Sequence, residues 1–382
     1  MLLKLKRPQW AIVFACASMF VLGMADNIRG PLFAELMSFF KLSNSEGSMT
    51  FAASSTAALV GSLSSVLFLK RLNLSQTLVA SVVMMGVGVY LMGAAPTFTS
   101  YMLYAVIFGF SLGLMGVVQN VIVAETVSKE RQSKVLSGLH GVYGLSSLLA
   151  PLIASRAPEI FGPWRSAFFI TSAIAAVVFV AALLVKPNPS FEVHAVQTTD
   201  QDKASWWALL TLGGVFAFYV VAEILVSTRL ALYMRTYFQM DLEQSSNYVT
   251  YFFIFLLLGR VAFAIKAFGH SLKMQLNISL TLSLIMLCLG LWVHPFFLAL
   301  VGLAMAPFYP LSVAFISEET GVHKRKFITF AMGFQSFCVI AMHLGVGYLT
   351  DRFGLFYAFG VGLAALSLSL FCVNFHPKVN PT

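Results

Sequence analysis

Four charged residues lie inside apolar stretches of the sequence: Asp26 and Arg29 in the first such stretch, Glu223 and Arg229 in the seventh. A charged side chain at the centre of a bilayer costs roughly 2.5 to 3.5 kcal/mol on insertion scales, so it is retained where it faces a protein interior or a solute or ion pathway. Residues three positions apart share a helical face, so Asp26 and Arg29 can pair or line one cavity. We interpret Asp26, Arg29 and Glu223 as an ion pathway in which Asp26 takes up and releases a proton; a purely structural ion pair is the alternative.

Glu223 cannot pair with Arg229 inside one straight helix, because six positions correspond to about 240° of rotation. Glu223 therefore needs another partner, a neutral state or contact with water. In the first stretch, Pro31 lacks a backbone donor and frees the carbonyl of Asn27, so the chain can bend next to Gly30. Two prolines, Pro307 and Pro310, predict a kink in the tenth stretch.

Polar side chains of the fourth and fifth apolar stretches form a second candidate group. A loop near Lys129 joins these stretches and places Asn120 and His140 at nearly equal depth, with Gln119 and Tyr143 beside them. Amides offer donors and acceptors while aromatic rings cover apolar sugar faces, so this set suits a polyhydroxylated ligand. The alternative for His140 is a bond to a neighbouring helix. The other candidate solute ligands are Asn27 and, in the second half of the chain, Tyr219, Asn247, Tyr251, Tyr309 and Gln335.

The motifs of several other functional classes are missing from the sequence. It has no nucleotide-binding loop and no G-x-S-x-G nucleophile motif, and its histidines lack the spacing of metal ligands. The four cysteines, all in apolar stretches, form no disulfide framework. We therefore expect no enzyme, no cofactor, no metal and no nucleic-acid partner.

The elements that must position these residues are membrane-spanning helices. The composition is 59% hydrophobic and 10% charged, whereas soluble domains carry about 25% charged residues. A helix needs about 20 apolar residues to cross a bilayer, and punctuation by Gly, Pro, Asn and charges separates the runs. The sequence predicts an all-α polytopic membrane protein with twelve spans, at about 10–38, 46–69, 75–94, 98–126, 132–156, 164–185, 206–235, 245–267, 272–293, 296–317, 326–350 and 355–375.

The distribution of the 24 lysine and arginine residues predicts the orientation. Sixteen lie on one side of the predicted spans, five on the other and three within spans, which accounts for all 24. Both termini therefore face the cytoplasm, and the net charge of +9 follows from this asymmetry. Charges at the cytoplasmic ends of spans recur in both halves and form a candidate gate, with ordinary interface charges as the alternative; the gate comprises Arg71, Glu125, Arg260, Lys266 and Glu318.

A polar stretch divides the chain into two halves. Residues 186–203 read as a solvated linker, because they contain prolines and charges and lack an apolar period. We predict an N-terminal six-helix bundle at 1–185, a cytoplasmic linker at 186–203 and a C-terminal six-helix bundle at 204–382. FFKLSNSEGSM after the first span is echoed by YFQMDLEQSSN after the seventh. A repeat of six and six spans is used by transporters that work by alternating access.

The sequence resembles the major facilitator superfamily and, within it, the fucose–proton symporters and sodium-dependent glucose transporter-like proteins. The stretches that carry this resemblance are GMADNIRGPLFAEL, GLMGVVQNVIVAE, LSGLHGVYGLSSLLAP, FYVVAEILVSTRLALYM and GLAMAPFYPLSVAFISEE. The resemblance implies two pseudo-symmetric six-helix bundles. The fucose symporters use an acid in span 1 and another in span 4, at positions that correspond to Gly30 and Gly116 here. Asp26 lies one turn before Gly30 and can substitute for the first acid.

We therefore expect a secondary active transporter of a small polar solute. The resemblance implies that this solute is a sugar or related polyol and that its transport is coupled to protons. Sodium is the alternative coupling ion. A proton-driven exporter of drugs or amphipathic metabolites is the alternative transporter, and a transport-inactive receptor or scaffold is more remote. The short loops and compact length suit the lipid bilayer of a bacterial inner (plasma) membrane, and we expect a monomer.

Overall fold

The computed structural model describes residues 7–185, 205–265, 271–377 and 379, which form helices and no strand. Twelve of these helical segments are long and apolar enough to cross a membrane. The prediction of an all-α membrane protein with twelve spans is therefore confirmed. The chain divides into two compact units: unit 1 contains Met1–Leu32 and Ala53–Val196, and unit 2 contains Phe33–Ala52 and Gln197–Thr382. The predicted linker at 186–203 falls outside the described residues, so the domain boundaries stay a prediction.

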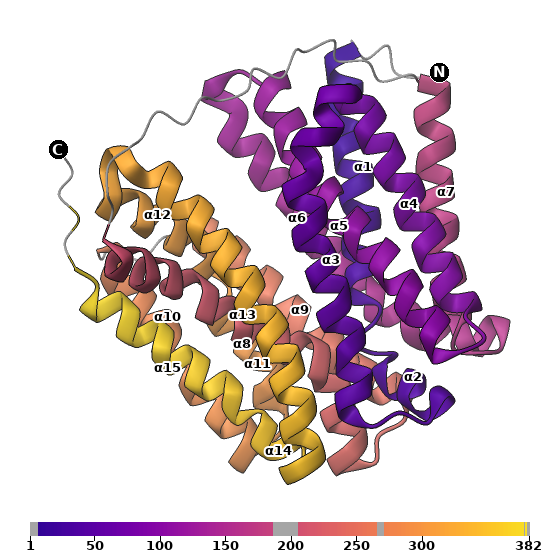
Figure 1. Ribbon diagram of the computed structural model, residues 1–382. Coiled ribbons are helices and arrows are strands. Elements are labelled where there is room, and N and C mark those ends of the chain that lie inside the picture. The colour runs from indigo at the N-terminus through magenta and orange to yellow at the C-terminus, as the bar shows by residue number, and fades with distance from the viewer. Residues whose placement is uncertain (1–6, 186–204, 266–270, 378, 380–382) are drawn as a thin grey trace. The chain divides into compact units, whose positions relative to one another are not determined.

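Unit 1 surrounds its first helix with four others (Figure 1). Helix α1 packs against α4, α5, α6 and α7, and α4 packs against α5 and α7. This places α1, which carries Asp26, at the centre of the unit. The helices of unit 1 are α1 (Arg7–Asn27), the greater part of α3 (Asn44–Arg71), α4 (Leu74–Ala94), α5 (Phe98–Thr126), α6 (Lys129–Phe161) and α7 (Ser166–Val185).

Unit 2 is organised around α8, which packs against α9, α13 and α15. Helix α9 packs on α11, and α10 packs on α11 and α15. The elements of unit 2 are α2 (Phe33–Phe40), the first turns of α3, α8 (Trp206–Phe238), α9 (Leu242–Ile265), α10 (Leu272–Trp292), α11 (Phe296–Met305), α12 (Phe308–Thr320), the 3₁₀ turn η1 (Gly321–His323), α13 (Lys324–Phe353), α14 (Leu355–Ala358) and α15 (Gly360–Phe375).

Two predicted spans are interrupted at their prolines. The first span ends as a helix at Asn27 and resumes as α2 at Phe33, with a turn that contains Pro31 between them. The tenth span is split between α11 and α12 at Ala306 and Pro307. A proline cannot donate the helical hydrogen bond and its ring clashes with the preceding turn, which accounts for both breaks. Asp26 therefore lies in the last turn of α1 and Arg29 in the turn that follows.

Close helix approaches in unit 1 depend on particular glycines. A Cβ at Gly23 of α1 would lie 2.0 Å from Ser146 Oγ of α6, and one at Gly109 of α5 would lie 2.1 Å from the carbonyl oxygen of Ser54 of α3. These contacts bring α6 and α3 against the helices that carry the charged residues. The sequence also has a glycine stripe on α6, Gly138, Gly141 and Gly144, which favours close helix packing. A Cβ at Gly138 or Gly141 would meet nothing within 4 Å, so close packing is not found at these two positions.

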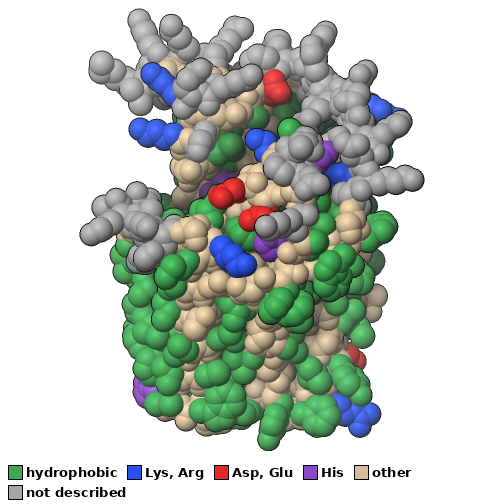
Figure 2. Space-filling model, turned by 90° about the vertical axis from the view of Figure 1, so that its left-hand side faces the viewer, with side chains coloured by type: hydrophobic (Ala, Val, Ile, Leu, Met, Phe, Trp, Pro, Cys, Tyr) green, Lys and Arg blue, Asp and Glu red, His purple; other side chains and the backbone are tan. Residues whose placement is uncertain are grey.

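The outer surface is suited to lipid. On the face shown in Figure 2, hydrophobic side chains cover much of the flank, and charged side chains gather toward the ends. Large apolar side chains such as Leu63, Leu184 and Trp206 are exposed. Exposing such an apolar surface to water is unfavourable, whereas the hydrocarbon of a bilayer accommodates it. The chain is therefore an integral membrane protein.

Candidate functional site

Asp26 and Arg29 form an ion pair at the end of α1. Arg29 Nη2 donates to Asp26 Oδ1 at 2.9 Å, and Arg29 Nε lies 3.5 Å from the Asp26 carbonyl oxygen. The side chain of Arg29 is 10% exposed and that of Asp26 is 31% exposed. The negative end of the helix dipole lies here, and a cation beside it is favourable. The predicted proximity of these two residues is confirmed.

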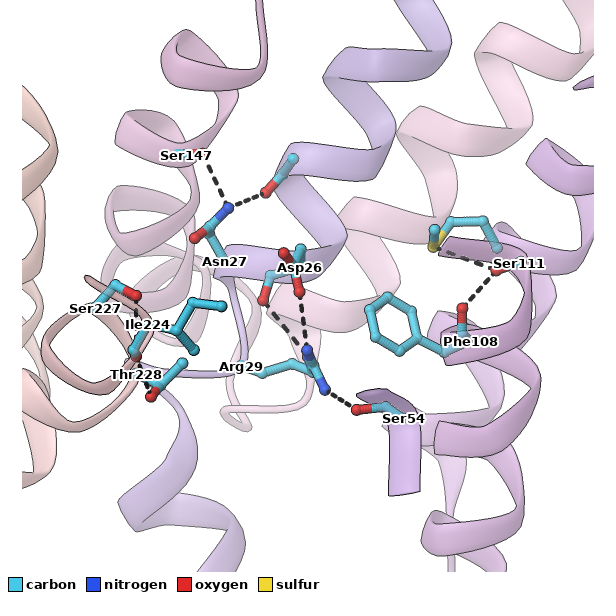
Figure 3. A network of polar contacts seen from close by, with 12 residues as sticks. Asp26, Asn27, Arg29, Ser54, Phe108, Ser111, Ser147, Ile224, Ser227 and Thr228 are labelled. Atoms are coloured by element: carbon cyan, nitrogen blue, oxygen red, sulfur yellow. Dashed lines mark hydrogen bonds and ion pairs between the residues drawn. The ribbon is translucent and has the colours of Figure 1, made fainter. Parts of the chain in front are cut away.

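Arg29 is held on its other side by α3 and α5 (Figure 3). Its Nη1 donates to Ser54 Oγ at 2.7 Å, and its guanidinium carbon lies 4.5 Å from the centroid of the Phe108 ring. A guanidinium over an aromatic face gains about 0.5 to 2 kcal/mol, and more as water is excluded. Arg29 therefore keeps two neutral partners besides Asp26, and its position does not depend on one ion pair.

The second oxygen of Asp26 has a different partner. The Tyr143 hydroxyl of α6 donates to Asp26 Oδ2 at 3.0 Å. Asn27 Nδ2 in turn lies 3.2 Å from Tyr143 Oη, 2.9 Å from Ser147 Oγ and 2.9 Å from the Gly23 carbonyl oxygen. We call Asp26, Asn27, Arg29, Tyr143, Ser147, Ser54 and Phe108 the α1 polar cluster. Its members come from α1, the turn after it, α3, α5 and α6, all within unit 1.

Glu223 finds its partner on another helix of unit 2. Arg260 Nη2 of α9 lies 3.7 Å from Glu223 Oε1 of α8, with side chains 30% and 20% exposed respectively. Tyr219 and Tyr309 interact electrostatically with this pair. The structure therefore brings four predicted residues together, among them Arg260, which the sequence analysis assigned to the gate.

Arg229 is fully buried and faces aromatic rings. Its guanidinium lies 4.2 Å from the Phe33 ring centroid and 4.8 Å from that of Phe51, and its Nη2 donates to Ser48 Oγ at 2.9 Å. The ring of His343 stacks on Phe51 with centroids 5.0 Å apart. All of these residues belong to unit 2. The cluster anchors α2 and the start of α3 to α8 and α13.

Two predicted solute ligands of α5 bond within unit 1. Gln119 is fully buried, and its amide donates to Ser18 Oγ of α1 at 2.9 Å. Asn120 is part-buried and donates to the Gly116 carbonyl oxygen at 2.7 Å. His140 is exposed on α6, one turn before Tyr143. Tyr143 contacts Asp26 and Asn27 of α1, so the structure adds α1 to the predicted set, and the cluster of α5 with α6 stays a prediction.

The predicted ligands of the second half are scattered. Tyr219 is fully buried and donates to the Met305 carbonyl oxygen at 2.9 Å. Tyr309 packs edge-on to Phe216, and Tyr251 is exposed and contacts Tyr248 and Phe296. Asn247 and Gln335 are part-exposed. Only Tyr219 and Tyr309 join the charged pair of this unit, and the solute-binding roles of the whole set stay predictions.

Three of the other predicted gate residues lie among the described residues. Arg71, Glu125 and Glu318 are exposed at helix ends, and the structure gives them no ion pair with any residue it describes. Lys266 lies outside the described residues. The gate stays a prediction.

Sequence reasoning missed three neutral members of the α1 polar cluster, Ser54, Phe108 and Ser147. Ser54 and Phe108 resemble ordinary residues of apolar helices, and nothing in their spacing connects them to Arg29. Ser147 had a signal, because it lies one turn after Tyr143 on the same face of α6. No pattern in the sequence connects Phe33, Phe51 or Ser48 with Arg229.

Comparison with known proteins gives one family match over most of the chain. The sequence model of the Major Facilitator Superfamily matches residues 15–341. The multidrug efflux pump SdrM of Staphylococcus aureus (strain N315) is 20% identical over 260 residues, 67% of this chain and 56% of that protein. The uncharacterized MFS-type transporter YfiU of Bacillus subtilis (strain 168) is 26% identical over 180 residues, 46% of this chain and 34% of that protein. The chain thus spans about half and about a third of the lengths of these two relatives.

Solved structures share the fold over nearly the whole chain. A D-xylose–proton symporter superposes with a TM-score of 0.77 at 15% identity, covering 97% of this chain and 98% of that one. A bacterial homolog to the human lysosomal transporter Spinster, in an inward-facing and occupied conformation, superposes with a TM-score of 0.75 at 11% identity, covering 97% of both chains. At these identities the likeness shows the fold alone.

Proposed function

Because this chain belongs to the major facilitator superfamily, we propose that it is a secondary active transporter that moves a small polar solute, most simply a sugar or related polyol, with protons. It would work by alternating access, as transporters with two six-span repeats do. The observation that carries this proposal is the α1 polar cluster, in which a part-exposed carboxylate is held by an arginine and a tyrosine within a membrane-spanning unit. Intramembrane ionisable groups with such partners are typical of proton relays.

The substrate class rests on chemistry that suits hydroxyl groups. Asn27, Tyr143 and Ser147 offer donors and acceptors close together, and sugar hydroxyls need both. A Cβ at Gly116 of α5 would meet nothing within 4 Å, so α5 borders open space one turn from Asn120. The fold is shared with a D-xylose–proton symporter, which supports a sugar as the first solute to test. The fucose–proton symporter branch remains a narrower proposal, because its two acids correspond to Gly30 and Gly116 here.

Export of drugs or amphipathic metabolites is the second candidate function. The similarity to the efflux pump SdrM favours it, and the 36 phenylalanines allow a more apolar binding surface. The two candidates differ in what binds and in the direction of coupled movement. A transport-inactive receptor or scaffold would retain neither coupled movement nor counterflow.

Reconstitution into proteoliposomes separates these functions. We expect counterflow of at least one labelled pentose, hexose or polyol, and its accumulation when an inward proton gradient is imposed without sodium. If accumulation requires a sodium gradient instead, sodium and not the proton is the coupling ion. Proton-driven movement of a lipophilic cation such as ethidium, without sugar counterflow, would establish the exporter. Absence of both activities in liposomes that contain folded protein would contradict the proposal.

A further inference from the structure

The last turns of α6 and the beginning of α7 border an open groove in unit 1. Its volume is about 320 Å³, within the range of roughly 300 to 1,000 Å³ that small-molecule sites occupy. Seven of its eight lining residues belong to α6, from Leu149 to Phe161, and the eighth is Ile170 of α7. The residues of α6 recur with helical spacing, so they form one face of the helix. Arg156 is the one lining residue that is not apolar.

The groove has about the length of one leaflet of a bilayer. From Leu149 to Phe161 the helix rises by about 18 Å, and half of a hydrocarbon core of about 30 Å is similar. Ile160 and Phe161 are 71% and 63% exposed. Trp164 follows in the turn after α6, and tryptophan is enriched where hydrocarbon meets headgroups. An acyl chain that lies along α6 therefore fits the groove, with its headgroup near the end of the helix.

A cation and an anion lie together at this end of the groove. Arg156 Nη1 donates to the two carboxylate oxygens of Glu159 at 3.2 and 2.9 Å, and the two side chains are 56% and 46% exposed. An exposed pair of this kind contributes little to stability, so each charge can exchange its partner at little cost. Ile160 and Phe161 continue the apolar surface beyond the pair. A ligand of this groove therefore meets apolar side chains along its length and both signs of charge at one level.

We propose that the groove binds one phospholipid whose headgroup carries a phosphate and a primary ammonium, as in phosphatidylethanolamine. One acyl chain lies along α6, the phosphate accepts from Arg156, and the ammonium donates to Glu159. A guanidinium matches the geometry of a phosphate with two parallel hydrogen bonds, and a primary ammonium offers three donors to a carboxylate. This lipid site goes beyond the proposed transport and requires no solute.

The same pair of charges discriminates against other headgroups. The quaternary ammonium of phosphatidylcholine has no N–H to donate, so Glu159 gains no hydrogen bond from it. Phosphatidylglycerol carries no cation, and its net negative charge lies beside the carboxylate of Glu159. A groove that only accommodates acyl chains would bind all three lipids equally. The headgroup preference is therefore the property to measure.

Native mass spectrometry of the purified, delipidated protein, titrated with single lipids of identical acyl chains, measures this preference. We expect one phosphatidylethanolamine to bind with a Kd at least about ten-fold lower than that of phosphatidylcholine or phosphatidylglycerol, since a hydrogen bond to a charged group accounts for that factor. Glu159→Gln removes the anion, so phosphatidylglycerol should then bind more tightly than phosphatidylethanolamine. Arg156→Gln should weaken the binding of phosphatidylethanolamine by about ten-fold or more.

Two tryptophan variants test the groove itself. Ile153→Trp fills the groove and keeps both charges, so it should remove the tightly bound lipid. Leu184→Trp is the matched control, because Leu184 is an 80% exposed residue of α7 outside the groove, and it should bind lipid like the parent protein. Equal affinities of the parent protein for the three lipids would overturn the proposal. A preference that Glu159→Gln leaves unchanged, or equal lipid binding by both tryptophan variants, would overturn it as well.

Discussion

The carboxylate of Asp26 is the group of the α1 polar cluster that we propose exchanges a proton. Arg29 keeps Ser54 and Phe108 as partners when Asp26 is neutral, so the cluster can tolerate a change of charge. Asp26→Asn has nearly the same shape and cannot bind a proton. We expect it to abolish gradient-driven accumulation while solute counterflow persists.

Proteoliposome uptake, measured with and without an imposed proton gradient, checks this. Glu46→Gln is the matched control, because Glu46 is a carboxylate at an end of α3 that bonds only its neighbour Ser43 among the contacts the structure gives. It should accumulate solute like the parent protein. Full accumulation by Asp26→Asn would remove Asp26 from the coupling pathway.

Gly116 borders open space. Substitutions that place a small or a large side chain in this space test whether the solute uses it. Alanine is about 1 kcal/mol better than glycine inside a helix, and its Cβ would meet nothing here, so Gly116→Ala should leave the melting temperature unchanged or raise it. Gly116→Phe should lower solute counterflow at least about ten-fold, the effect of losing about 1.4 kcal/mol of binding, by occupying the space beside Asn120.

The control for this pair lies one turn earlier on α5. A Cβ at Gly113 would lie 1.8 Å from the carbonyl oxygen of Ala58 on α3. Gly113→Ala should therefore lower the melting temperature, because the backbones of two helices must separate. Parental counterflow in a folded Gly116→Phe protein would show that the solute does not pass this position.

At the scale of elements, the start of α3 is capped by a residue from α13. The backbone nitrogens of Asn44 and Ser45 donate to the two carboxylate oxygens of Asp351 at 2.9 and 2.8 Å, and both side chains bond the same carboxylate. The first amides of a helix have no partner within it, and an acceptor there contributes about 1 kcal/mol. Asp351→Ala should therefore increase hydrogen exchange at residues 44–48 by about five-fold.

Hydrogen exchange followed by mass spectrometry measures this effect. Asp241→Ala is the matched control, since Asp241 accepts from the backbone nitrogen of Gln244 at 2.7 Å at the start of α9. It should loosen the first turn of α9 and leave α3 unchanged. If Asp351→Ala leaves hydrogen exchange at 44–48 unaltered, the start of α3 is held by the contacts of Arg229 with Ser48 and Phe51 instead.

Elements were predictable from the sequence where the cause is local. Twelve spans follow from the length of the apolar runs, and the break after Asn27 follows from Pro31. The pair of Asp26 and Arg29 follows from helical spacing. The partners of Glu223 and Arg229 were not predictable, because Arg260 and the rings of Phe33 and Phe51 are brought there by packing between helices distant in the sequence. The close approach of Gly23 to Ser146 likewise joins helices that are distant in the sequence.

At the scale of the whole molecule, the distribution of basic residues predicts how the chain lies in its membrane. Segments rich in lysine and arginine stay on the cytoplasmic side during insertion. Of the 24 basic residues, 16 lie at span ends on the side of the N-terminus and 5 on the opposite side. Twelve spans, the number that the described residues offer, would place both ends of the chain on one side. We propose that this side is the cytoplasm of a bacterial cell.

Single cysteines report the orientation directly. In a variant whose four native cysteines (Cys16, Cys288, Cys338 and Cys372) are replaced by serine, we expect a membrane-impermeant maleimide added to intact cells to label Lys41→Cys and Arg156→Cys. Lys70→Cys and Lys324→Cys should be labelled only after the membrane is permeabilised. All four positions are at least part-exposed, so a failure to react reflects the membrane barrier and not burial. The opposite labelling pattern would place the basic side outside, and equal labelling of all four in intact cells would mean that the protein inserts in both orientations.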